Sequence, residues 1–194
     1  MLLDSRFVRL PCYDKWEDIT GIHYTDKDWE CFNLAANKCT PSIDLRWFQY
    51  RIIHRILPTK RFLFKIKYTD SPKCSFCNTF DETIYHIFWE CSKVENIWRE
   101  LKTWLGTVDV KLNFTVSQVL FGVKGKNNYA LNAMVILVKK IIYICSQNGF
   151  IPTTAYIKKQ IINYYNITKY VYINLGQEAY FLKLWSSLHL LLRE

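Results

Sequence analysis

Four metal-ligand side chains lie within eighteen residues of this 194-residue chain, and they constrain its folding more than any other feature of the sequence. Two residues separate Cys74 from Cys77, eight separate Cys77 from His86, and four separate His86 from Cys91. Three thiolates and one imidazole are the usual ligand set of a closed, tetrahedral zinc site. The spacing therefore predicts one structural zinc ion. The alternative is a group of ordinary buried thiols beside a core histidine.

The interval between the last two ligands decides how the chain must run there. His86 and Cys91 are five residues apart, which is about 140° around an ideal α-helix, so an unbroken helix cannot direct both at one ion. Ser92 and Glu95 are spaced as a capping box that starts a new helix. We therefore expect Cys91 in a break between a short helix carrying His86 and a helix over residues 92–105. Four protein ligands leave no open position, which disfavours a catalytic zinc.

Apolar periodicity and helix-end signals predict helices over most of the remaining chain. Residues 1–25 have no sustained period, and Pro11 and Gly21 are interpreted as breaks, so this segment is expected to be an irregular lead-in. Helices are expected over residues 26–38, 43–57, 60–68, 92–105, 115–120 and 129–147, and residues 153–192 are also interpreted as helical. The predicted fold class is mostly α, a helical bundle-like domain with a small inserted CCHC zinc knuckle. Residues 26–106 would contain a basic helical pair and the knuckle, and residues 107–194 a C-terminal helical region.

Positive charge is concentrated in two stretches of the chain, whose formal net charge is +9. Residues 45–69 contain seven Lys or Arg and no acid, and residues 110–177 contain eight and no acid. Lys and Arg that neutralise phosphates release condensed counterions, so acid-free basic stretches favour a polyanionic partner. A solubilising surface is the alternative explanation of the same composition.

The first basic stretch is expected to form two helices joined by a turn. Pro58 should end the first helix at Leu57, because the residue before proline avoids helical angles. Arg51 and Arg55 would then lie four residues apart on one helical face. Thr59 can cap the second helix. Its apolar residues Phe62, Leu63 and Ile66 are expected to face inward, with the lysines and arginines outside.

The remaining thiols, Cys12, Cys31, Cys39 and Cys145, have no partner at metal spacing and are expected to be buried and reduced. No uninterrupted apolar run of signal-peptide type opens the chain, which predicts an intracellular protein. The most apolar run, residues 133–145, is interrupted by two lysines and is too short to span a bilayer, so it predicts a core helix and no membrane association.

Taken together, these residues resemble the zinc-binding region of reverse transcriptases of LINE-type (non-LTR) retrotransposons. The resemblance depends on the segment Leu45–Lys60, on Cys74-x-x-Cys77, on the run Glu82-Thr-x-x-His86-Ile-Phe-Trp-Glu-Cys91, and on Ile97-Trp98. It is specific from about residue 16 to residue 105 and continues more weakly to about residue 165. The metal pattern of the family corresponds to Cys74, Cys77, His86 and Cys91.

The resemblance implies a region downstream of the polymerase that binds template RNA and target DNA. The polymerase portion of the same element would be a further partner, and the family implies a location in the nucleus as well as the cytoplasm. The implied activity is binding and not catalysis. A polymerase needs an aromatic-x-Asp-Asp signature for its catalytic metal ions, and this sequence contains no adjacent Asp-Asp pair.

One hypothesis about nucleic-acid contacts follows from the first basic stretch. Its cations would line a phosphate-contacting groove: Arg46, Arg51, Arg55, Lys60, Arg61, Lys65 and Lys67. Trp47 and Tyr50 are candidates for base stacking on the same surface, and the alternative is that they belong to the core. Three other interpretations remain open: a zinc-stabilised protein-interaction module, a decayed element fragment without an independent role, and a metal-dependent hydrolase. The closed ligand set disfavours the hydrolase.

Overall fold

The computed structural model describes residues 9–107, 113–125 and 128–192. Within these ranges the regular structure is helical, and a single isolated bridge between Lys73 and Asp81 is the only β-type pairing. The elements are α1 (Pro11–Thr20), α2 (Asp26–Cys39), α3 (Ile43–Ile53), α4 (Lys60–Lys65), the π-helix η1 (His86–Glu90), α5 (Ser92–Gly106), α6 (Val116–Phe121), α7 (Tyr129–Gln147), α8 (Thr154–Asn174) and α9 (Glu178–Trp185). The prediction of a mostly α fold is confirmed.

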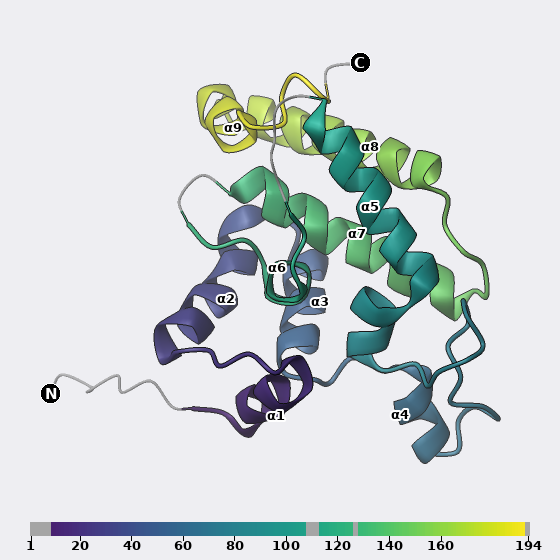
Figure 1. The fold of residues 1–194 in the computed structure, drawn as a ribbon. Helices are drawn as coiled ribbons and strands as arrows, with labels where there is room; N and C mark the ends of the chain where they lie inside the picture. Colours follow the sequence, from purple (N-terminus) through teal and green to yellow (C-terminus); the bar gives the residue numbers. More distant parts are fainter. Residues whose placement is uncertain (1–8, 108–112, 126–127, 193–194) are drawn as a thin grey trace, which may run out of the picture.

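The helix α7 runs through the middle of the molecule (Figure 1), where it packs against α2, α3, α8, α9 and η1. Thirteen of its nineteen residues are buried, on all sides of the helix, as expected for a core helix. By length and composition alone α7 could cross a membrane, but 72% of its apolar window is buried inside the protein. Its central position therefore accounts for its hydrophobicity. Elements on both sides of residue 107 contribute to this one core.

The expectation of an irregular N-terminal segment is wrong for residues 11–20, which form α1; residues 1–8 lie outside the described ranges. Pro11 and Gly21 are the two ends of this helix and not breaks in it. Proline suits the first helical position because its missing N–H needs no partner there. Gly21 has a φ of 65°, and its N–H bonds to the carbonyl of Glu17. The helix buries Tyr13 and Trp16.

The first basic helix ends earlier than expected, at Ile53 and not at Leu57. Arg55 has a φ of 58°, in the left-handed region. Its N–H bonds to the carbonyl of Ile52, and the N–H of Ile56 bonds to the carbonyl of Arg51, which together form a Schellman motif. Arg51 and Arg55 therefore do not share a helical face. The chain leaves the helix before it reaches Pro58.

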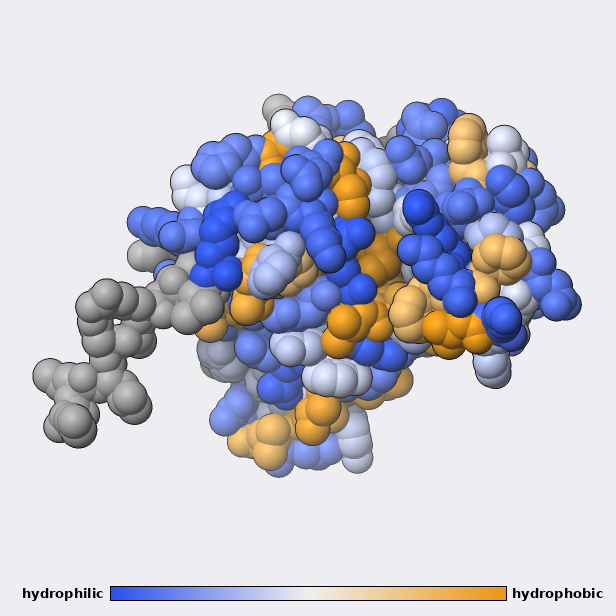
Figure 2. Space-filling model, turned by 90° about the horizontal axis from the view of Figure 1, so that it is seen from below, coloured by the Kyte–Doolittle hydropathy of each residue, from blue (hydrophilic) through white to orange (hydrophobic). Residues whose placement is uncertain are grey.

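The second basic helix, α4, is shorter than expected, and its apolar side chains do not face inward. Phe62 and Ile66 are 52% and 56% exposed, and Leu63 is half-buried. α4 projects from the body of the protein beside α1 (Figure 1), and it makes few core contacts. On the face seen from below, hydrophobic and hydrophilic residues alternate over this part of the surface (Figure 2).

The C-terminal prediction is confirmed as helical, with one interruption. α8 and α9 are separated by residues 175–177, where Gly176 adopts a φ of 66°. The helix expected over residues 115–120 is α6, which begins with a capping box formed by Thr115 and Gln118. The helix expected over residues 129–147 has the predicted bounds.

Candidate metal centre

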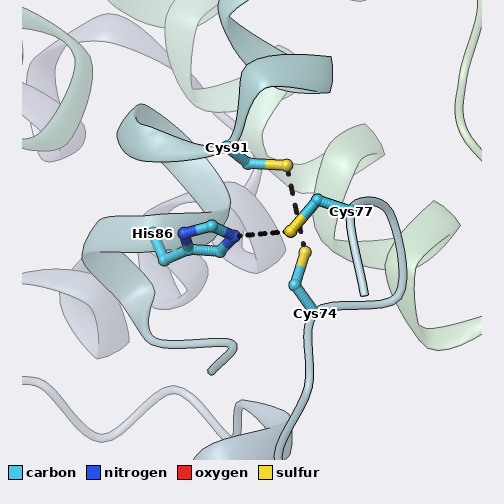
Figure 3. A group of neighbouring side chains, drawn as sticks. All are labelled: Cys74, Cys77, His86 and Cys91. Atoms are coloured by element: carbon cyan, nitrogen blue, oxygen red, sulfur yellow. Dashed lines mark hydrogen bonds between the residues drawn. The ribbon is translucent and has the colours of Figure 1, made fainter. Parts of the chain in front are cut away.

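The four predicted ligand side chains meet at one point in the structure (Figure 3). Their sulfur and nitrogen atoms all lie within 4.8 Å of one another. The Sγ atoms of Cys74 and Cys91 are 3.9 Å apart, and Cys77 Sγ is 3.4 Å from His86 Nε2. A tetrahedral zinc ion separates its ligand atoms by about 3.8 Å for two sulfurs and about 3.5 Å for sulfur and nitrogen. The cluster therefore has the dimensions and the donor set of a small zinc site.

A tight turn positions the first two cysteines. The N–H of Asn78 bonds to the carbonyl of Cys74 at 2.9 Å, and the N–H of Phe76 approaches Cys74 Sγ at 3.4 Å. Asn78 takes a φ of 53°, a left-handed conformation that asparagine tolerates better than most residues. The N–H of Cys74 bonds to the carbonyl of Phe80, so the chain returns antiparallel to itself. Both sulfurs are thereby directed at one point.

A π-helical turn resolves the five-residue interval between His86 and Cys91. In η1 the N–H of Cys91 bonds to the carbonyl of His86 at 2.9 Å, the i→i+5 pattern of a π-helix. This wider turn brings residues five apart onto the same side, which a regular α-helix does not do. The expected break at Cys91 is confirmed, because its φ and ψ of −65° and 119° are not helical. The π-turn itself was not foreseen.

The predicted capping box at Ser92 and Glu95 is wrong. The N-cap of α5 is Cys91, and no side chain caps this end of the helix. The carbonyl of Cys91 instead accepts the N–H groups of Val94 and Glu95 at 2.8 and 2.9 Å. Because Cys91 has this cap position, its side chain stays free to face the other three ligands.

Burial and hydrogen bonds shift the pKa values of the cysteine thiols in the cluster. Cys74, His86 and Cys91 are buried, and Cys77 is half-buried. The hydrogen bond to Cys91, with burial, raises the pKa of Cys74 to about 12. The same bond lowers the pKa of Cys91. Burial raises the pKa of Cys77, but the backbone N–H groups of Phe80 and Thr79 outweigh it, so the net direction is down. A bound metal ion would replace the shared thiol protons.

Glu82, which sequence reasoning did not single out as a functional residue, ties the cluster to the rest of the protein. Its carboxylate is fully buried and accepts the N–H of Lys60 at 3.1 Å and the hydroxyl of Ser146 at 2.6 Å. Its carbonyl accepts the N–H of Arg61. Glu82, and not the side chain of Thr59 as expected, therefore caps the start of α4. No local pattern in the sequence identifies this cap, because Glu82 lies twenty-two positions from Lys60.

The structure brings together only some of the seven cations that were predicted to line a groove. Arg55, Arg61 and Lys65 line a groove of about 800 Å³ between α1, α4 and the segment before η1. Arg46 and Arg51 lie along α3, and Arg46 donates to the carbonyl of Pro41 at 2.6 Å. Lys60 and Lys67 do not line this groove either. This groove therefore contains three of the seven predicted cations, and phosphate contacts by all seven stay a prediction.

Trp47 and Tyr50 are not core residues. They are 53% and 43% exposed, and their rings stack with centroids 5.0 Å apart and planes 9° apart. The ring of His54 continues the row, 3.9 Å from that of Tyr50. The core alternative is excluded for both aromatic residues, and base stacking stays a prediction.

The fold and the cluster define a class: a helical module in which a compact Cys₃His site joins a short basic helix to a larger core. Residues 15–98, from α1 into α5, match the family described as zinc-binding in reverse transcriptase. The match includes all four cluster residues. This segment is therefore similar to the zinc-binding modules that are associated with reverse transcriptases. No curated protein matches the chain.

Proposed function

We propose that this chain is a zinc-stabilised nucleic-acid-binding module that acts with a LINE-type reverse transcriptase. Template RNA, target DNA or both would be its ligands, and the polymerase portion of the same element its protein partner. The observation that carries the proposal is the position of the Cys₃His cluster directly beside an exposed basic helix. The family match and the acid-free composition of residues 45–69 support it.

Zinc is the metal that best fits the donor set. Three sulfurs and an imidazole nitrogen at tetrahedral spacing are typical of structural zinc, whereas magnesium and calcium prefer oxygen ligands. Cys74, Cys77, His86 and Cys91 would hold it, and the ion would hold the knuckle closed. Four protein ligands fill the tetrahedron, so the module is proposed to bind and not to catalyse.

The metal would act on nucleic-acid binding through the position of α4. Glu82 lies between the first and second pairs of ligands and bonds to the first two N–H groups of α4. Closing the knuckle therefore fixes the residue that caps the basic helix. Loss of the metal would leave α4 without this anchor and disperse its cations.

The test is fluorescence anisotropy of zinc-loaded protein with a structured RNA and a single-stranded DNA across a salt series. Contacts to phosphates predict an affinity that falls steeply with salt, because each neutralised phosphate releases counterions. The double variant Cys74→Ser/His86→Ala should lose zinc, measured by mass spectrometry of the metal, and most of its affinity. Weak, salt-insensitive binding by folded, zinc-loaded wild-type protein would overturn the proposal.

A protein-interaction module is the second candidate, and a specific surface favours it. Ile167, Tyr170 and Leu175, on and just after α8, are 64%, 68% and 63% exposed. Ile167 and Tyr170 are three residues apart in α8 and therefore neighbours on the helix surface, where exposed apolar side chains can contact a partner. This reading predicts that nucleic acid binds weakly while the isolated polymerase portion binds tightly and independently of salt.

A further inference from the structure

The groove between α1 and α4 has a volume of about 800 Å³ and combines cations with apolar side chains. Lys15 and Ile19 of α1 lie on one wall, and Arg61, Phe62 and Lys65 of α4 lie on the other. Seen from below, this face is hollowed between the two helices, with hydrophobic residues inside the hollow and hydrophilic residues at its rim (Figure 2). The groove therefore offers both phosphate-binding and base-binding chemistry.

The charge of the groove is strongly one-sided. Four cations line it, Lys15, Arg55, Arg61 and Lys65, together with one carboxylate, Glu90. Glu90 Oε2 is 3.8 Å from His86 Nδ1, so this acid lies toward the metal centre. Within the described ranges, none of the four cations has a carboxylate at ion-pair distance. Four cations without ion-pair partners make this groove a site for a polyanion.

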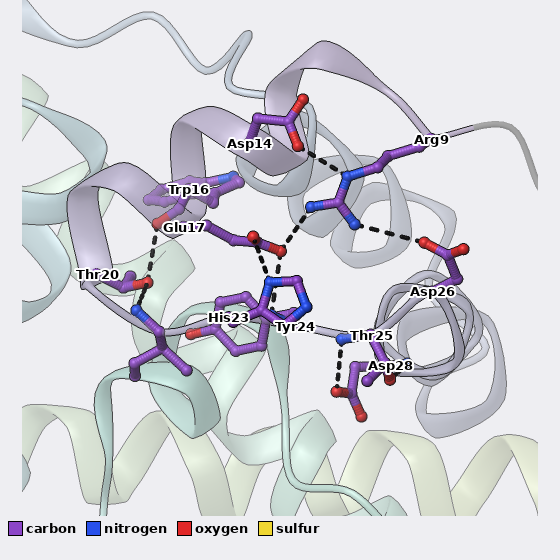
Figure 4. A network of polar contacts seen from close by, with 11 residues as sticks. Arg9, Asp14, Trp16, Glu17, Thr20, His23, Tyr24, Thr25, Asp26 and Asp28 are labelled. Carbon is purple, nitrogen blue, oxygen red and sulfur yellow. Dashed lines mark hydrogen bonds and ion pairs between the residues drawn. The ribbon is translucent and has the colours of Figure 1, made fainter.

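None of the three acids of α1, Asp14, Glu17 and Asp18, lines the groove, and Arg9 holds two of them. Arg9 bonds to Asp14 at 2.8 Å and to Glu17 at 2.7 Å, and Glu17 also accepts the N–H of Tyr24 (Figure 4). These bonds outweigh the effect of burial and lower the pKa of Glu17 to about 2. Lys15 lies between these two acids in sequence but lines the groove. The ion pairs with Arg9 thus hold Asp14 and Glu17 away from Lys15 and the groove.

Arg55 contributes charge at a position that favours glycine. It occupies the left-handed residue of the Schellman motif after α3, where a side chain costs energy that glycine avoids. Its guanidinium lies over the ring of Trp16, 4.8 Å from the ring centroid, which holds it in place at the groove. A cation that is fixed in this way needs little reordering when it binds a phosphate.

A row of exposed rings continues from the groove along α3. His54 lines the groove, and its ring is followed by the stacked rings of Tyr50 and Trp47. On the opposite wall Phe62 is half exposed to solvent. Tyr50 is covered by its two neighbours, whereas Trp47 at the outer end of the row is 53% exposed. Exposed aromatic surface next to cations is the arrangement that binds unpaired bases, since every base has a face on which to stack.

We propose that the α1–α4 groove and the ring row on α3 bind a single strand of RNA or DNA in preference to a duplex. Phosphates contact Lys15, Arg55, Arg61 and Lys65, while unpaired bases stack on Phe62 and on Trp47, the outer ring of the row. In a duplex the faces of the bases are covered by the neighbouring base pairs, so they cannot stack on these rings and the rings do not strengthen duplex binding. This inference rests on the proposed nucleic-acid-binding function and names its substrate class.

The experiment compares a short labelled strand that cannot pair with itself and a hairpin of the same length and base composition, by fluorescence anisotropy at matched salt. Zinc-loaded wild-type protein should bind the single strand about tenfold more tightly or better, the effect of one stacked base. In the double variant Trp47→Leu/Phe62→Leu this preference should disappear while hairpin affinity stays unchanged. Tyr156→Leu on α8 is the control, since Tyr156 is an exposed ring that does not line the groove.

The α1 wall is tested separately. Lys15→Gln should reduce the slope of affinity against salt by about one phosphate contact, whereas Lys27→Gln, on the exposed start of α2, should leave it unchanged. Equal wild-type affinity for strand and hairpin, with a steep salt slope, would overturn the single-strand inference and leave the proposed function standing. Failure of folded, zinc-loaded protein to bind either ligand would overturn the proposed function itself.

Discussion

The knuckle and the α7 core are held in place by different forces. Around α7, thirteen buried residues of one helix pack against five neighbouring elements. At the tip of the knuckle, Asn78, Thr79 and Phe80 are exposed, and the loop is fixed by its turn and by four ligand side chains. Many small apolar contacts stabilise the core, so no single one is essential. The knuckle depends on one cluster.

The ends of the helices differ between the basic stretch of residues 45–69 and the C-terminal half of the chain. The C-terminal helices α7 and α8 are followed by Gly149 and Gly176, with φ values of 73° and 66°. The basic helices α3 and α4 end in the same hydrogen-bonding motif but with Arg55 and Lys67 at the left-handed position, at 58° and 59°. Glycine is the more stable choice there. At the ends of α3 and α4 a charged residue therefore occupies a position where glycine would be more stable.

Removing the metal should produce the largest effect, and it should be local to the knuckle. Structural zinc contributes about 10–16 kcal/mol of apparent binding energy in small peptides, comparable to the whole net stability of a domain. In the Cys74→Ser variant, residues 72–85 and α4 should lose protection from hydrogen exchange. The amides of α7 should keep theirs, because their hydrogen bonds are inside the apolar core.

Cys31 was expected to be buried, but the structure places it at the surface, and this exposed thiol gives the control for the comparison. Cys31→Ser should leave zinc content, hydrogen exchange and the unfolding temperature unchanged. If metal removal instead unfolds α7 together with the knuckle in one transition, the two regions are not independent and the comparison fails.

The core contains one fully buried lysine, Lys139 of α7, within the part of the chain that the structure describes. Its Nζ donates to Gln49 Oε1 at 2.6 Å and to the carbonyl of Leu120 at 2.9 Å. Burial lowers its pKa from 10.5 to about 7. Between about pH 7 and pH 10, the unfolded chain therefore binds a proton that the folded chain lacks, and the free energy of unfolding rises with pH. Below pH 7 the folded protein carries the buried charge, and this stabilisation is absent.

Lys139→Met should therefore raise the free energy of unfolding near pH 6 by roughly 1–4 kcal/mol and flatten its increase toward pH 9. Urea unfolding of zinc-loaded protein at several pH values measures both. Lys140→Met is the matched control, because the neighbouring Lys140 reaches Asp44 at the surface, with an Nζ to Oδ1 distance of 3.1 Å. An unchanged pH dependence in Lys139→Met would show that Lys139 is not the titrating group.

Glu82→Gln should have a smaller effect, because it weakens the contact between the knuckle and the core while both regions stay folded. A buried, charge-assisted hydrogen bond contributes about 1.5–3 kcal/mol. The glutamine amide keeps one acceptor oxygen in place of two and carries no charge, so the hydrogen bonds to Lys60 and Ser146 cannot both be kept as they are and the cap of α4 is weakened. Hydrogen exchange should increase over residues 60–66 while zinc content stays at the wild-type level. Loss of zinc in this variant would contradict the assignment of Glu82 as a joint between knuckle and core.

The sequence predicted well what local chemistry decides. Ligand spacing identified the Cys₃His cluster, and apolar periodicity gave α7 its bounds. It predicted poorly what depends on distant partners. Glu82 caps α4 from twenty-two positions away, and no local pattern announces such a cap. The same holds for the inward face expected of α4: Phe62 and Ile66 have helical spacing, but within the part of the chain that the structure describes both stay more than half exposed. Pro11 and Gly21 were misread because both residues end helices as readily as they break them.

Lys67→Gly should have the smallest effect on folding and the opposite sign from most substitutions. Glycine adopts the left-handed conformation at φ 59° without strain. The free energy of unfolding of the variant, measured by urea unfolding, should therefore rise by about 0.5–1 kcal/mol.

Gly149→Ala, at the matching position after α7, should lower stability for the same reason. If Lys67 also contacts a phosphate, the salt slope of binding should decrease by about one in Lys67→Gly, although the protein is more stable. A gain in stability with unchanged binding would show that Lys67 does not contact a phosphate. The contrast between charged and glycine helix ends would then not mark the binding surface.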